Sequence, residues 1–129
     1  MGAWGAGTFE NDDASDWLYE LEQSTGFDFV RTSLEATDGE YIEAPDGAAA
    51  LAAGEIVAAA LGRPAQELPD TAVSWLATQS GITSADRASA VAAIDRVTSD
   101  ASELRELWED SEDESWGAHV DDLRRRLLG

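Results

Sequence analysis

The chain has 129 residues, the size of one ordinary domain, and 43% of them are hydrophobic, enough for one folded core. It carries 27 acidic and 8 basic residues, a formal net charge of -19, and every basic residue is an arginine. This charge argues against binding to nucleic acid or anionic membranes, while it permits a basic protein partner. Its main interpretation is a solvated surface that keeps the protein soluble. The lack of cysteine excludes disulfides and thiolate metal sites.

No run of apolar residues is long enough to span a membrane. The alanine-rich run 48–61 is too short and is interrupted by Gly54 and Glu55. The N-terminus lacks the basic and apolar regions of a secretory signal, and Ala6 stands where a myristoylation motif needs Ser or Thr. We therefore expect a cytoplasmic protein.

Helical spacing of apolar residues dominates the first third of the chain. The first helix is predicted from residue 11 to about 24, with Asn11 or Asp12 as its N-cap. A short second helix is predicted over 28–37, and 40–45 reads as an extended connector, too isolated to indicate a sheet. The residues expected to face the core here are Ala14, Trp17, Leu18, Leu21, Val30 and Leu34.

A long alanine-rich helix is predicted in the middle of the chain. Asp46 is expected to cap it, and Gly62 to end it. Its small side chains make it the candidate for the centre of a bundle, and Gly54 indicates tight packing there, because glycine weakens a helix interior. The next helix is predicted to open at Pro69-Asp70 and to end at Ser80-Gly81. Its expected apolar positions are Val73, Trp75 and Leu76.

Three further helices are predicted in the C-terminal part. Ser84 is expected to cap the first, Ser99 or Ser102 to begin the second, and Ser115 to begin the last, after an acidic break at 109–114. The apolar positions expected on them are Val91, Ile94, Val97, Leu104, Leu107, Trp108, Trp116, Val120, Leu123 and Leu127. The sequence therefore predicts a single all-α domain over residues 1–129, a bundle of about six or seven helices.

A glycine- and tryptophan-rich arm precedes the first helix. Its glycines at positions 2, 5 and 7 do not form a phosphate-binding loop, because no strand precedes them and acidic residues follow. Two interpretations of Trp4 compete. It could plug the bundle while the glycines permit tight turns, which is the interpretation we favour. Alternatively, Trp4 and Phe9 could line a recognition groove for a partner.

Acidic residues gather where the first helix begins. Glu10, Asp12, Asp13, Asp16 and Glu20 include i, i+4 pairs that could share Mg²⁺ or Ca²⁺. Helix capping and a solvated face are the favoured interpretation, so no metal or cofactor is predicted. Residues 110–121 fail as an EF-hand loop, because Ser115 and Asp121 stand where glycine and glutamate are needed.

The N-terminal segment also carries a family resemblance. Residues 1–14, which read MGAWGAGTFENDDA, together with Asp16 and Trp17, resemble a bacterial family described as domain of unknown function 4259. Three later segments agree with it: 53–62, 103–108 and 116–127. The resemblance implies a small single-domain bacterial protein, and it implies no known activity. Function must therefore be argued from the site itself.

Two hypotheses of function follow, and the first is favoured. The protein is a non-enzymatic interaction or accessory protein that binds a basic protein through its acidic surface or its N-terminal arm. Alternatively, it is a small metal-dependent hydrolase that uses Asn11, Asp12, Asp13 and Asp16. The candidate binding residues are Trp4, Phe9, Asn11, Asp12, Asp13 and Asp16.

Overall fold

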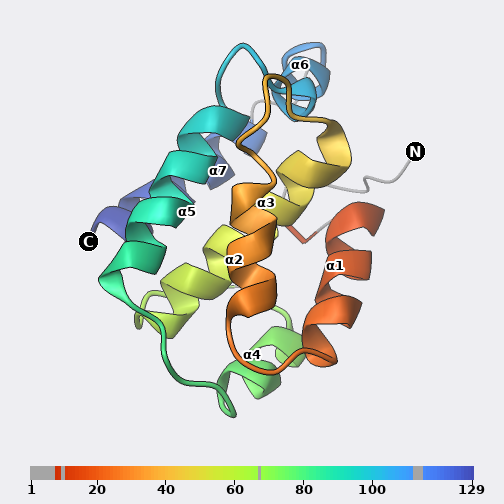
Figure 1. Cartoon of the computed structure of the whole chain (residues 1–129). Helices are drawn as coiled ribbons and strands as arrows, with labels where there is room; N and C mark the ends of the chain where they lie inside the picture. The colour runs from red at the N-terminus through yellow and green to blue at the C-terminus, as the bar shows by residue number, and fades with distance from the viewer. Residues whose placement is uncertain (1–7, 10, 67, 112–114) are drawn as a thin grey trace.

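Helix α3 (Ala44–Ala60) runs through the centre of the molecule, and the other helices pack around it (Figure 1). Eleven of its 17 residues are buried, and five of these are alanines. It contacts α1, α2, α4, α5, α6 and α7. A helix that is apolar all round is stable only when it is covered on every side. The predicted central position of this helix is therefore confirmed.

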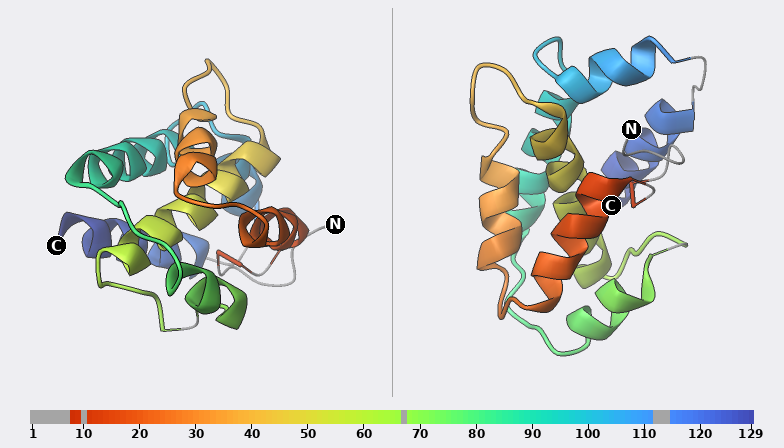
Figure 2. Two further views of the ribbon diagram at one scale, coloured as in Figure 1. Left: turned by 60° about the horizontal axis from the view of Figure 1, so that its bottom comes forward. Right: turned by 90° about the vertical axis from the view of Figure 1, so that its right-hand side faces the viewer.

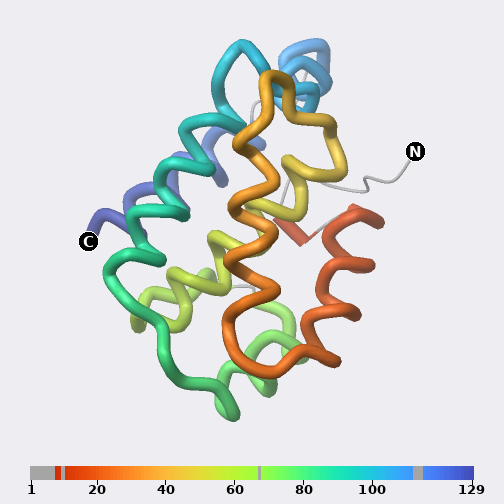
Figure 3. The backbone as a smooth tube through the Cα atoms, viewed as in Figure 1, coloured from red at the N-terminus to blue at the C-terminus, as the bar shows by residue number. Residues whose placement is uncertain are grey.

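The computed structural model describes residues 8, 9, 11–66, 68–111 and 115–129. These residues form seven α-helices and no strand, so the all-α prediction is confirmed. Figure 2 shows the arrangement of the helices from two further sides, and Figure 3 shows the path of the backbone. Besides α3, the helices are α1 (Asp12–Glu22), α2 (Asp28–Glu35), α4 (Asp70–Leu76), α5 (Ser84–Val97), α6 (Glu103–Glu109) and α7 (Ser115–Leu128). Within the described ranges no helix is both long and apolar enough to cross a membrane.

The two ends of α3 differ in how well the sequence predicted them. The helix begins at Ala44, so the predicted cap at Asp46 is wrong. Pro45 fits the first turn because a proline needs no hydrogen-bond acceptor there, and the Ala44 N–H donates to Glu103 Oε1 at 2.7 Å. At the other end the predicted Gly62 is confirmed, with a φ of 91°. This left-handed conformation lets the Gly62 and Arg63 N–H groups reach the last carbonyls of α3.

Gly54 lets α5 and α7 approach α3 closely. A Cβ atom at this position would lie 3.3 Å from a methyl carbon of Leu123 and 3.5 Å from one of Ile94. Both of these side chains belong to the hydrophobic core. The prediction that Gly54 marks tight packing is therefore confirmed, and the reason is that two neighbouring helices fill the space a side chain would need.

The connector before α3 pairs with the connector before α6. The Ile42 N–H donates to the Ala101 carbonyl at 2.8 Å, and the Glu103 N–H donates to the Ile42 carbonyl at 2.9 Å. This is an isolated parallel bridge, so the prediction of a connector without a sheet is confirmed for residues 40–43, whereas Ala44 and Pro45, also predicted in the connector, belong to α3. Ser102, one of the two predicted starts, is the N-cap of α6. The Tyr41 hydroxyl adds a 2.7 Å hydrogen bond to Glu106.

Several local predictions are wrong. The N-cap of α5 is Thr83, because Asp86 completes a capping box with it, and Ser84 is already helical. Helix α4 ends at Leu76, well before Ser80. Val73 and Leu107 were expected on apolar faces, yet they are 51% and 55% exposed. Each lies on a two-turn helix, too short for periodicity to define its buried side.

Figure 1 shows α7 behind α5, and an ion pair joins α7 to α3. Glu55 is 3% exposed. Its two carboxylate oxygens accept hydrogen bonds from Arg126 Nη1 and Nη2 at 2.8 and 3.0 Å. Arg126 also donates to Asp122 and to the Arg63 carbonyl. A buried carboxylate needs such partners, because its removal from water is otherwise very costly.

We predict that breaking this pair from one side destabilises the protein more than replacing both partners. Arg126→Met should lower the free energy of unfolding by about 3 kcal/mol, because it leaves Glu55 buried without a counter-charge. The double variant with Glu55→Leu and Arg126→Met should lose much less of the free energy of unfolding. Urea unfolding of the wild type, both single variants and the double variant measures the coupling. Additive losses would contradict a coupled buried pair.

Candidate functional site

Asn11 holds the start of α1. Its Oδ1 accepts the Ala14 N–H at 2.8 Å, and its Nδ2 donates to the Thr8 carbonyl at 3.2 Å. Asn11 is therefore the N-cap, one of the two residues predicted for that role. Both polar atoms of its side chain are used within the chain, so its place in the structure is that of a capping residue.

Asp12, Asp13 and Asp16 are all exposed on α1. Asp12 and Asp16 share a helical face with Tyr19, since the three are spaced i, i+4, i+7. The Tyr19 side chain is 67% exposed. Among the described residues no ion pair engages these aspartates, and no group of three or more acidic or histidine side chains is placed to hold a metal ion.

The structure describes one of the two aromatic residues that were predicted to act in the arm. Phe9 is half-buried and packs against the hydrophobic core. Trp4 lies outside the described residues, as does Glu10. Both interpretations of Trp4, the plug and the recognition groove, therefore stay predictions.

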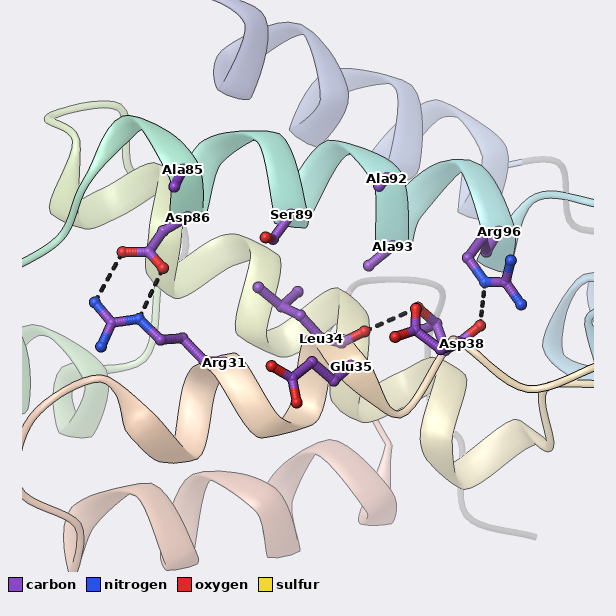
Figure 4. A pocket seen from close by; sticks show the side chains of 11 residues that line it. Arg31, Leu34, Glu35, Asp38, Ala85, Asp86, Ser89, Ala92, Ala93 and Arg96 are labelled. Atoms are coloured by element: carbon purple, nitrogen blue, oxygen red, sulfur yellow. Dashed lines mark hydrogen bonds and ion pairs between the residues drawn. The ribbon is translucent and has the colours of Figure 1, made fainter.

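A groove that the sequence did not reveal lies between α2 and α5, with a volume of about 220 Å³ (Figure 4). Leu34 and Glu35 line it from α2. On α5 its lining repeats at about one-turn intervals, and these residues are Ala85, Asp86, Ser89, Ala92, Ala93 and Arg96. The small-residue spacing on α5 was the available signal, but small residues line tight helix contacts equally often.

One end of the groove is closed by an ion pair between α2 and α5. Arg31 Nε and Nη2 donate to the two carboxylate oxygens of Asp86 at 2.8 and 3.0 Å. Arg31 also donates to Asp28 and to the Gly81 carbonyl. The Arg31 guanidinium lowers the pKa of Asp86, and hydrogen bonds from Thr83 lower it further. Asp86 therefore caps its own helix and ties that helix to α2.

The other end of the groove is held by Arg96. Its guanidinium donates to the carbonyls of Thr37 and Gly39, just beyond the end of α2. A cation near this position is also favoured by the negative end of the α2 helix dipole. Asp38 lies beside Arg96 at this end, as Figure 4 shows, and its carboxylate is exposed. The two ends of the groove are therefore both fixed by arginines.

We predict that Asn11→Ala lowers the free energy of unfolding by about 1 kcal/mol, because it removes the side-chain cap of α1. Asn11→Asp should lose far less, since a carboxylate oxygen can accept the same N–H. Urea unfolding of the two variants beside the wild type measures this difference. Equal losses in both variants would show that the Asn11 amide has a role beyond the cap.

We predict that the loss of unfolding free energy caused by Asp86→Asn depends on pH. The folded-state pKa of Asp86 is lowered, so its ion pair stabilises the protein above the unfolded-state pKa, and this contribution disappears as the pH falls through the folded-state value. Asp86→Asn should therefore destabilise strongly at neutral pH and much less in acid. Denaturant unfolding across that range measures it. Asp95→Asn is the control, because its pair with Arg124 is about half exposed. A pH-independent cost would contradict the ion pair.

Comparisons with known proteins identify a family and nothing closer. The family model described as domain of unknown function (DUF4259) matches residues 2–119. No curated protein and no solved structure matches the chain. The matched range includes the Asn11 cap, the acidic face of α1 and the whole groove between α2 and α5. The chain therefore belongs to the DUF4259 family.

Proposed function

We propose that this protein is a non-enzymatic, cytoplasmic interaction protein that binds a basic protein partner through the outer face of α1. We call this surface the α1 acidic face, and its residues are Asp12, Asp13, Asp16, Tyr19 and Glu20. The observation that carries the proposal is the charge of this face. Its four carboxylates are exposed, and among the described residues none has an ion-pair partner.

The arginines of the described chain bind groups outside the α1 acidic face, and this supports the proposal. Four arginines bind carboxylates of the chain, namely Arg31, Arg105, Arg124 and Arg126. Arg96 binds backbone carbonyls instead. None of these five lies on α1, which contains no basic residue. The field of the α1 acidic face is therefore available to an external cation, and complementary charge speeds and orients association.

Tyr19 gives this face a feature beyond charge. It is the most exposed large hydrophobic side chain of the described chain, and it lies within one turn of Asp16. Exposed tyrosines are enriched among the anchors of protein interfaces, because the ring buries a large area and the hydroxyl keeps a hydrogen bond. An aromatic ring among carboxylates fits a basic protein surface better than a small anionic ligand.

Neutralising the α1 acidic face should abolish partner binding. The variant carries Asp12→Asn, Asp13→Asn, Asp16→Asn and Glu20→Gln. Wild-type and variant proteins are used as bait at low salt in extract of the source organism, and retained proteins are identified by mass spectrometry. We expect a basic protein that the wild type retains, that high salt releases, and that the variant retains at least about tenfold less.

A matched control removes the same number of charges from other surfaces. It carries Glu40→Gln, Asp46→Asn, Asp70→Asn and Asp110→Asn, all at exposed positions. Two of these acids lie in the first turns of helices, as Asp12 and Asp13 do. Circular dichroism confirms that both variants stay helical. The proposal fails if every protein that the wild type retains is held equally by the α1 variant, or if the control loses it as well.

A further inference from the structure

Apolar side chains form part of the lining of the groove between α2 and α5. Leu34 forms its α2 side, and Ala85, Ala92 and Ala93 lie along α5 opposite, as the close view in Figure 4 shows. Its volume is about 220 Å³, whereas an engineered cavity of about 150 Å³ is enough to bind benzene. The groove therefore has room for the aliphatic part of one long side chain.

The charges around the groove are unequally satisfied. Arg31 is neutralised by Asp86 and by Asp28. Arg96 donates from Nε and Nη2 to two backbone carbonyls. Glu35 and Asp38 also line the groove, and both are exposed, with no ion pair to any described residue. Glu35, Asp38 and Arg96 are thus the charged groups of the lining without an ion pair to a described residue, and the carboxylates of the lining outnumber its guanidinium groups by three to two.

We infer that this groove receives an arginine or lysine side chain of the basic protein partner, an inference that rests on the proposed function. The aliphatic stem lies against Leu34 and the α5 alanines, and the cationic head binds Glu35 and Asp38. Long basic side chains bind in this way because their stems are apolar while their heads need water or a carboxylate. An anionic ligand is disfavoured, since the lining holds more carboxylates than guanidinium groups.

The groove and the α1 acidic face can meet one partner. Helix α2 lies between α1 and α5 in Figure 1. The Trp17 ring of α1 stacks on Phe29 of α2, and Arg31 of α2 binds Asp86 of α5. Because side-chain contacts fix the three helices to one another, a partner that crosses α2 can contact both surfaces without a change of conformation.

The direct test titrates the protein with N-acetyl-arginine amide and follows backbone amides by two-dimensional ¹⁵N NMR. We expect saturable shifts centred on Leu34, Ser89 and Ala92. N-acetyl-citrulline amide, a neutral analogue of the same shape, should cause no comparable shifts. Shifts that scatter over the acidic surface without saturation, or equal shifts from citrulline, would overturn the inference.

Two pairs of variants locate the binding. Ala92→Leu fills the groove from an exposed position, while Ala88→Leu adds the same bulk to α5 outside the lining. Glu35→Gln with Asp38→Asn removes the unpaired charges, and Glu40→Gln with Asp46→Asn is its control. The groove variants should weaken binding by about tenfold or more, and the controls should leave it unchanged. Equal effects within either pair would overturn the inference.

The two proposals can fail separately. Neutralising the α1 acidic face should leave the arginine-amide shifts in place, because those residues do not line the groove. If the partner is retained through α1 while the groove variants bind it as well as the wild type does, the proposed function stands and the groove inference is wrong. If arginine amide saturates the groove but no partner depends on the α1 acidic face, the proposed surface is wrong.

Discussion

The burial of α3 on all sides is the constraint on which the rest of the structure depends. A helix built mainly from alanine offers little apolar area per residue, so it is stable only when neighbours cover it closely. Gly47 and Gly54 let Leu104 and Leu123 come within contact of the helix backbone. The surrounding helices therefore contribute most of the large apolar side chains of the core, while the small residues of α3 let those helices pack close to it. This division explains how a chain rich in alanine forms one shared core.

Ion pairs join several helices of the bundle to one another. Glu55–Arg126 joins α3 to α7, Arg31–Asp86 joins α2 to α5, and Arg124–Asp95 joins α7 to α5. Each uses an arginine, and the chain has only eight basic residues against 27 acidic ones. Because basic residues are so few and three of the arginines are used in these joints, most of the acidic residues have no counter-charge. The structural use of arginine and the uncompensated charge on α1 thus both follow from the small number of basic residues in the chain.

The sequence predicted those features that depend on neighbouring residues. The all-α fold, the Asn11 cap, the Gly62 end of α3 and the tight contact at Gly54 all follow from spacing or from a residue's own preference. Features that depend on distant partners were not predictable. The ion pair between Asp86 and Arg31, which are 55 residues apart, is such a feature. The Thr83 cap, in contrast, follows from the local spacing of Thr83 and Asp86 and was open to prediction. The groove also could not be predicted from the sequence, because its two walls are formed by separate helices.

The pairing of the two connectors has a consequence for local stability. Helix α6 has no buried residue, and the bonds that Ile42, Tyr41 and Ala44 make with its first turns tie it to the segment before α3. Segments with few buried apolar contacts open at lower free energies than the core does. Ile42 of the connector is 1% exposed and belongs to the hydrophobic core, so the connector is held by the core while α6 is held mainly by these bonds and by Leu104. In hydrogen exchange, the amides of α6 would therefore open more readily than the connector amides to which they are joined.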